Sequence, residues 1–176
     1  MELAWVRILR RVGTKIKKCT RTKEGLIVHH KYEDHAILLG DVTFAQRNPY
    51  EWQLPENLVY CDYLEHLLLH ILICENPSEN HNDFEVVGIG GVINFLVPEL
   101  NDLYSGWVTK QEWRSNCHRL VINDKDVYLT LLKRFKYNCS NCIFYKKDCL
   151  FTSFNDQYGL WSKKNNEPLF KEIKLL

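Results

Sequence analysis

The segment that most constrains the fold is a short apolar run that leads directly into a capped helix. Residues 57–61 read Asn-Leu-Val-Tyr-Cys, which favours a β-strand, and Asp62 follows them. Aspartate accepts hydrogen bonds from the first amide groups of a helix, and Glu65, three residues later, completes a capping box. The sequence therefore predicts a helix from residue 63 to about residue 75, ending before Asn76-Pro77 because proline disfavours helical geometry in the preceding residue.

An earlier strand is predicted to end in two histidines. The β-favouring run at residues 26–28 leads into His29 and His30. On the predicted helix, His66 and His70 are four residues apart and so share a face. A strand end and a helix face that each carry imidazoles can form a compact metal site.

The rest of the chain gives a coarser pattern. Residues 31–56 contain Gly40, Asn48-Pro49 and Pro55, which predict an irregular connection with one short helix or strand. Residues 76–83 are a polar linker, and the glycine-punctuated apolar run at 84–97 is compatible with either strand or helix. Its Gly88-x-Gly90-Gly91 lacks the context of a dinucleotide site. Two further helices are predicted at 109–117 and 124–136.

Length and hydropathy indicate a protein with its own core and no membrane span. The chain has 176 residues, of which 45% are hydrophobic. The longest apolar stretch, residues 67–74, is far shorter than the roughly 20 residues that cross a bilayer. We expect a cytoplasmic protein without a membrane partner.

Charge is unevenly distributed although the net charge is only +1. Residues 1–24 hold eight Lys and Arg against two Glu, whereas residues 33–85 hold eleven Asp and Glu against one Arg. This asymmetry predicts a polyanionic partner for the basic end and metal or structural roles for some central carboxylates. Solvated surface charge is the alternative for the N-terminal cluster. The residues assigned to DNA contact are Arg10, Arg11, Lys15, Lys17, Lys18, Arg21 and Lys23.

Seven cysteines, an odd number, argue against a disulfide framework. Cys139-x2-Cys142-x6-Cys149 begins like a zinc site, and Cys117 is the candidate fourth ligand from upstream, with the adjacent His118 as the alternative. Ordinary reduced thiols are the other interpretation.

The residue types suit phosphodiester hydrolysis. A divalent cation on His29 and His66 can act as a Lewis acid toward a phosphate. His30 points to the other side of the strand end, and an imidazole has a pKa suited to taking a proton from water. Asn57 can hydrogen-bond either the backbone or an imidazole that must be held in one tautomer.

Together, Val28-His29-His30, residues 57–60 and Glu65-His66-x3-His70 resemble the HNH endonuclease family with its ββα-metal finger. The resemblance covers residues 26–75. It implies that His29 and His66 are metal ligands, that His30 is the general base and that Asn57 orients it, with His70 as a further ligand or support.

This chain departs from the family pattern in two places. The segment between His30 and Asn57 is longer than in compact members, with Gly40-Asp41 where many have a Gly-Gly turn. The cysteine pairs that bind structural zinc in some members are absent around the motif.

These observations lead to one expected architecture and function. We expect an α+β fold with a ββα-metal core at 25–76, a basic DNA-contacting segment at 1–24 and a recognition region at 84–176. The expected activity is metal-dependent cleavage of double-stranded DNA with Mg²⁺ or Mn²⁺, by a homing or restriction-like endonuclease of a bacterial or phage-infected cell. A homodimer would allow both strands to be cut, and structural Zn²⁺ is a further candidate cofactor.

Two alternatives remain open. One is a non-catalytic, zinc-stabilised nucleic-acid-binding protein. The other is a structural zinc site made by Cys61, His66, His70 and His29.

Overall fold

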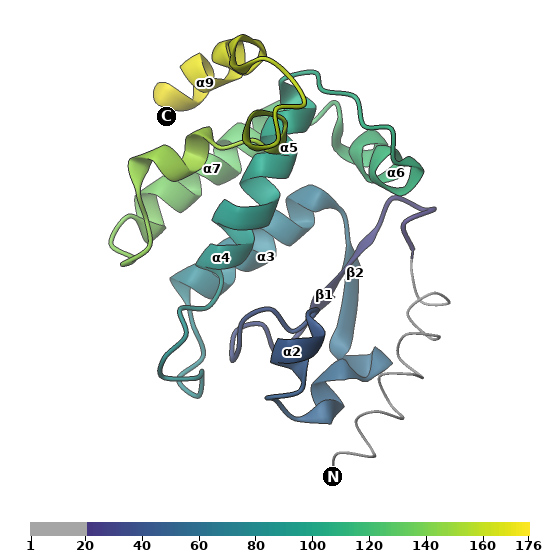
Figure 1. Ribbon diagram of the computed structural model, residues 1–176. Coiled ribbons are helices and arrows are strands. Elements are labelled where there is room, and N and C mark those ends of the chain that lie inside the picture. Colours follow the sequence, from purple (N-terminus) through teal and green to yellow (C-terminus); the bar gives the residue numbers. More distant parts are fainter. Residues whose placement is uncertain (1–20) are drawn as a thin grey trace.

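A computed structural model describes residues 21–176 as an α+β protein that is mostly helical and has one two-stranded antiparallel sheet (Figure 1). The strands are β1 (Ile27–His30) and β2 (Leu58–Cys61). His30 lies opposite Leu58 in the pairing register, at the end of the sheet where the chain leaves β1. Both predicted strands are confirmed, although β2 begins one residue later than expected because Asn57 closes a 3₁₀ turn.

The connection between the strands is irregular, as predicted. It contains a short helix, α2 (Val42–Ala45), and two 3₁₀ turns, η1 (Tyr50–Gln53) and η2 (Pro55–Asn57). This long connection returns the chain antiparallel to β1 and folds over the strand end that carries the histidines.

Helix α3 (Tyr63–Glu75) follows β2 after a single residue, and its predicted capping box is confirmed. The Asp62 carboxylate accepts hydrogen bonds from the amides of Leu64 and Glu65, both at 2.8 Å. The Glu65 carboxylate in turn accepts one from the Asp62 amide at 2.9 Å. The cap thus fixes the start of the helix at Tyr63, three residues before its first histidine, His66.

The remaining chain is helical, including the glycine-rich segment that the sequence left undecided. There the structure has α4 (Ile89–Gly91), followed by η3 (Val92–Leu96), which is a π-helix. The elements that follow are α5 (Val97–Tyr104), α6 (Glu112–Val121), α7 (Lys125–Cys139), η4 (Lys147–Phe151), α8 (Phe154–Gln157), η5 (Lys163–Asn165) and α9 (Glu167–Lys174).

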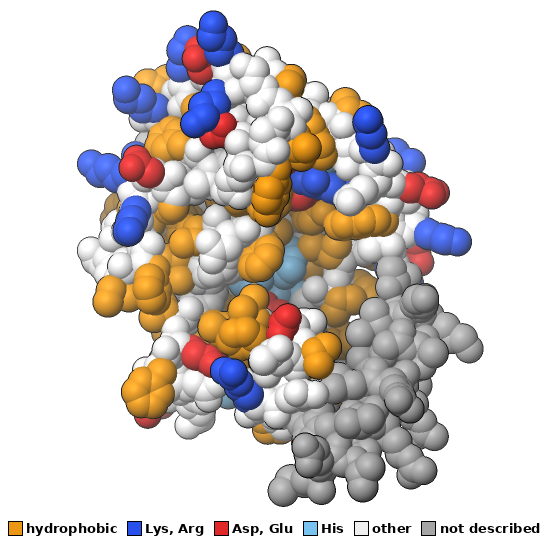
Figure 2. Space-filling model, in the orientation of Figure 1, with side chains coloured by type: hydrophobic (Ala, Val, Ile, Leu, Met, Phe, Trp, Pro, Cys, Tyr) orange, Lys and Arg blue, Asp and Glu red, His pale blue; other side chains and the backbone are white. Residues whose placement is uncertain are grey.

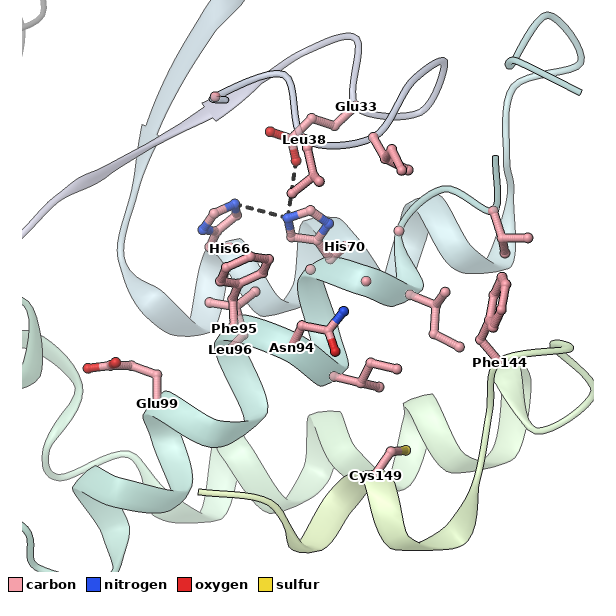
Figure 3. A pocket seen from close by; sticks show the side chains of 18 of the residues that line it. Glu33, Leu38, His66, His70, Asn94, Phe95, Leu96, Glu99, Phe144 and Cys149 are labelled. Carbon is pink, nitrogen blue, oxygen red and sulfur yellow. Dashed lines mark hydrogen bonds and ion pairs between the residues drawn. The ribbon is translucent and has the colours of Figure 1, made fainter. Parts of the chain in front are cut away.

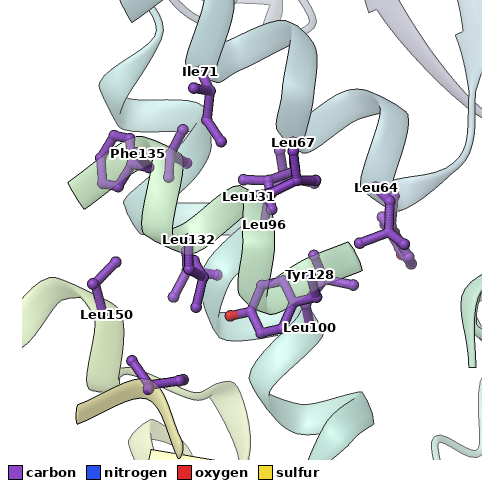
Figure 4. Packing of buried hydrophobic residues seen from close by; sticks show 14 of the residues in the cluster. Leu64, Leu67, Ile71, Leu96, Leu100, Tyr128, Leu131, Leu132, Phe135 and Leu150 are labelled. Carbon is purple, nitrogen blue, oxygen red and sulfur yellow. The ribbon is translucent and has the colours of Figure 1, made fainter. Parts of the chain in front are cut away.

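Helix α3 is shared between the sheet and the helical part of the molecule. Its apolar face packs on α7, α4 and η3, and Figure 4 shows Leu64, Leu67 and Ile71 directed into this packing. Tyr128 and Phe135 of α7 are fully buried in the same cluster. The helix therefore lies between this hydrophobic core and the sheet, where the His29 ring faces His66 and His70.

Within residues 21–176, none of the helices combines the length and the apolar character needed to cross a membrane.

Candidate metal centre

Four side chains from three parts of the chain converge beside the end of β1. They are His29 on the strand, Glu33 in the turn after it, and His66 and His70 on α3. Each offers one metal-ligating atom, and these atoms all lie within 4.8 Å of one another. Figure 3 shows Glu33, His66 and His70 pointing toward a common space.

The distances between the donor atoms match those around a bound ion. His66 Nε2 lies 3.1 Å from His70 Nε2, His70 Nε2 lies 3.2 Å from Glu33 Oε2, and His29 Nδ1 lies 3.4 Å from the same oxygen. Ligands at zinc bond lengths in a tetrahedral site stand about 3.3 Å apart. Three pairs of donor atoms therefore already have the spacing that a tetrahedral divalent cation requires.

One unpaired atom of the cluster is itself a candidate ligand. Nδ1 of His29 is buried, makes no hydrogen bond and faces Oε2 of Glu33 at 3.4 Å. Buried polar atoms are nearly always paired, so this nitrogen needs an explanation. A divalent cation between His29 and Glu33 would satisfy it.

The protonation states favour metal binding. Burial lowers the pKa of His66 to about 3 and that of His70 to about 4, and it lowers the pKa of His29 as well. Burial alone would raise the pKa of Glu33, but the interactions with His30 and with the neighbouring imidazoles outweigh it and lower this pKa to about 2. At neutral pH the cluster is thus three neutral imidazoles and one carboxylate, which can accept a cation without first losing protons.

His30 is held between two side chains. Gln53 donates from Nε2 to the Leu39 carbonyl at 3.0 Å, which orients its amide so that Oε1 accepts from His30 Nε2 at 3.1 Å. The tautomer with a proton on Nε2 follows from this network. The other nitrogen, Nδ1, lies 3.4 Å from Oε1 of Glu33. Glu33 therefore joins His30 to the metal cluster.

The side chain that contacts His30 is thus Gln53 rather than Asn57. Asn57 donates from Nδ2 to the Glu51 carbonyl at 2.8 Å, and its own carbonyl accepts from the Lys31 amide at 3.0 Å. The sequence allowed the Asn57 side chain to bond either the backbone or an imidazole, and in the structure it bonds the backbone. Since Glu51 and Gln53 belong to the same turn, η1, Asn57 positions the segment that holds His30.

Sequence reasoning missed both Glu33 and Gln53. The spacing His-His-x2-Glu was available as a signal for Glu33, because one turn of chain after the strand brings it back toward His29 and His30. Gln53 gave no such signal, since it lies in an isolated 3₁₀ turn. The nearby Asp34 and His35, which are also metal-ligating residue types, pair with each other at 2.6 Å instead of joining the cluster.

The glycine-rich segment makes room for His70. A Cβ added to Gly91 would lie 2.3 to 2.5 Å from atoms of the His70 ring. Gly88 has a φ of +81°, and a Cβ there would lie 2.7 Å from the His70 carbonyl oxygen. Close packing of α4 against α3 therefore explains these glycines, and it sets the orientation of one candidate ligand.

The cluster opens into a cleft of about 1420 Å³ between the strand part of the molecule and the helices that follow α3. Glu33, His66 and His70 lie in its wall. Figure 2 shows histidine at the bottom of this hollow, surrounded by hydrophobic side chains. A cation held by the cluster would thus be reachable from solvent.

Among residues 21–176, the His29 cluster is the only group of three or more His, Cys, Asp or Glu that could hold a metal ion. The four thiols suggested for zinc, those of Cys117, Cys139, Cys142 and Cys149, do not form such a group. Cys117 is beside Tyr63, whereas Cys139 and Cys142 both lie beside Cys74, which was not among the four. Cys61 contacts the Ile27 carbonyl, and Glu33 takes the place that the structural-zinc alternative gave to this thiol.

Most of the predicted DNA-contacting cluster, from Arg10 to Lys18, lies outside the described residues. Arg21 pairs with Glu24 at 3.3 Å and lies over the Tyr60 ring, while Lys23 is exposed.

Comparisons with protein-family models, curated protein sequences and solved structures find no match to this chain. The resemblance to HNH endonucleases therefore depends on the motif residues alone.

Proposed function

We propose that this protein is a metal-dependent nuclease that hydrolyses phosphodiester bonds, with a divalent cation held by His29, Glu33, His66 and His70. The observation that carries the proposal is the contact from Glu33 to both the metal cluster and His30, at the wall of an open cleft. The order of elements, β1, β2 and then α3, is also the order that the HNH resemblance implies. When bound, the cation would supply Lewis-acid stabilisation of the phosphate.

His30 would act as the general base. Gln53 accepts from Nε2 and so leaves Nδ1 as the nitrogen that can take a proton. Nδ1 faces Glu33, whose negative charge stabilises the imidazolium that forms. Asn57 would affect His30 indirectly, because its side chain donates to the backbone of the η1 turn that carries Gln53.

A second candidate function is a zinc-stabilised nucleic-acid-binding protein without catalysis. The observation that favours it is the number of protein donors, because four ligands complete a tetrahedral zinc site and leave no position for water. Mg²⁺ or Mn²⁺ prefers six ligands, so the same four side chains would leave two positions for water and phosphate.

The experiment that separates the two is cleavage of plasmid and oligonucleotide DNA by the purified chain. The protein is first stripped with chelator and then supplied with Mg²⁺, Mn²⁺ or Zn²⁺. Cleavage that needs added metal and is lost in His30→Ala, while metal binding persists, supports the nuclease. Tight stoichiometric Zn²⁺ binding without cleavage under any metal supports the structural role and overturns the nuclease.

A further inference from the structure

The walls of the cleft above the metal cluster are unusually apolar for a site that would receive nucleic acid. Several large apolar side chains stand at its edges and are exposed to solvent. They are Leu38, Phe84, Phe95, Trp113 and Phe144. Exposed apolar side chains that gather around one hollow mark a binding surface rather than scattered surface residues.

Phe95 is the aromatic residue of this set whose position bears most directly on the candidate metal centre. It belongs to η3, which packs on α3, and Figure 3 shows its ring on the wall of the cleft that also holds His66. Both residues line the cleft, and Phe95 is 52% exposed. π-Helical turns are rare and are often found at functional sites. Here the turn places a half-exposed aromatic side chain in the wall of the cleft that holds the metal cluster.

The cleft is poor in cations, so contacts with bases rather than with a row of phosphates would have to supply most of its affinity for nucleic acid. Among the described lining residues, Lys146 is the only Lys or Arg. Glu99, which also lines the cleft, is tied to Arg114 and His118. A duplex presents two rows of phosphates, and proteins that track it supply several cations.

Metal binding would add positive charge to the cleft at one place, the His29 cluster. A divalent cation together with the Glu33 carboxylate and three neutral imidazoles leaves a net positive charge on that wall, which is complementary to one phosphate group. The apolar walls around it are complementary to the faces of bases, which are exposed only when the bases are unpaired.

We propose that this cleft binds a nucleic-acid strand with unpaired bases, and that a base next to the scissile phosphate stacks on Phe95. The inference rests on the proposed nuclease function and narrows its substrate to single strands or to unpaired regions within a duplex. Base stacking on an aromatic side chain contributes about 1–3 kcal/mol, so its loss weakens binding about 5- to 150-fold.

The test uses the full chain loaded with Mn²⁺ and one oligonucleotide sequence in three forms: single-stranded, fully paired, and paired with a central unpaired loop. We expect the first and third forms to be cleaved at least tenfold faster than the second. Phe95→Ala should lose this preference together with single-strand affinity, whereas Phe95→Trp should keep both. Tyr137→Ala, at an exposed aromatic residue outside the cleft, is the matched control.

The possible failures are distinguishable. Equal cleavage of paired and unpaired forms, or wild-type affinity of Phe95→Ala for single strands, overturns the inference and leaves the nuclease in place. If no form is cleaved, the proposed function fails. Fluorescence anisotropy with the single strand then decides the inference by itself: binding that depends on Phe95 supports it, and absent or Phe95-independent binding overturns it.

Discussion

Oε1 of Glu33 lies 3.4 Å from Nδ1 of His30, while the other oxygen of the same carboxylate faces His29 and His70. One carboxylate therefore serves both the candidate metal site and the candidate base. This arrangement ties the orientation of His30 to occupancy of the metal site, because an ion on Oε2 would hold the carboxylate in place. Loss of Glu33 should consequently disturb two functions at once.

Glu33→Gln keeps the size of the side chain and removes its charge. We expect the affinity for Mn²⁺ or Zn²⁺ to fall by at least about tenfold, because an anionic donor is lost from the cluster. Isothermal titration of the metal into the stripped protein measures this change. Glu79→Gln, at an exposed position of the 76–83 linker, is the control and should bind metal like the wild type. Equal affinities of the two variants would exclude Glu33 as a ligand.

His30→Ala should separate catalysis from binding. The loss of a general base is expected to reduce the cleavage rate by about 10²- to 10⁴-fold. His30 is not one of the four clustered donors, so metal affinity should change little, and DNA affinity should stay within a few-fold. Single-turnover cleavage and metal titration on the same preparation give the comparison. A wild-type rate at saturating metal would remove His30 from the mechanism.

Local sequence patterns were sufficient to predict the elements that carry the site. The β1 and β2 strands and the capped helix α3 depend on interactions within a few residues, and their bounds were predicted to within one or two positions. The shared face of His66 and His70 followed from the helical period alone. These features determine where three of the four clustered donors lie.

The rest of the site depends on the path of an irregular connection. Such a segment has no repeating hydrophobic pattern from which its path could be predicted. Glu33 and Gln53 reach His30 only because the 31–57 connection folds back over β1. The 84–97 segment could not be assigned because its glycines weaken both helix and strand propensity. Its helical form is set by packing against α3, where Gly91 accommodates the His70 ring.

The metal-free protein should lose stability as the pH falls below neutral. The pKa values of His66 and His70 are lowered by burial to about 3 and about 4, against 6.5 for an unperturbed histidine. Between these values the unfolded state binds more protons than the folded state, so stability is full above pH 6.5 and falls progressively toward pH 4. Glu33, with its pKa lowered to about 2 from 4.5, adds a loss of the same sign below pH 4.5.

Urea unfolding of the stripped protein between pH 7.5 and pH 4.5 measures this dependence. His66→Gln should flatten the profile, because glutamine does not titrate. A wild-type profile that is flat across this range would show that the buried imidazoles do not resist protonation.

Gly91→Ala tests whether the packing of α4 against α3 orients His70. The added methyl group would lie 2.3 to 2.5 Å from the His70 ring, so the ring must move or the two helices must separate. We expect weaker metal binding by about tenfold or more, since a displaced imidazole no longer faces His66 and Glu33. The neighbouring Gly90→Ala is a closely matched control. Its added Cβ would meet only Asn94 Nδ2, at an ordinary contact distance of 3.8 Å. Both variants make the same change in neighbouring positions of one helix, so a general effect on α4 would appear in both. Metal affinity lost in Gly91→Ala and kept in Gly90→Ala would assign the effect to the His70 ring, whereas equal affinities would show that the ring can move without cost to the site.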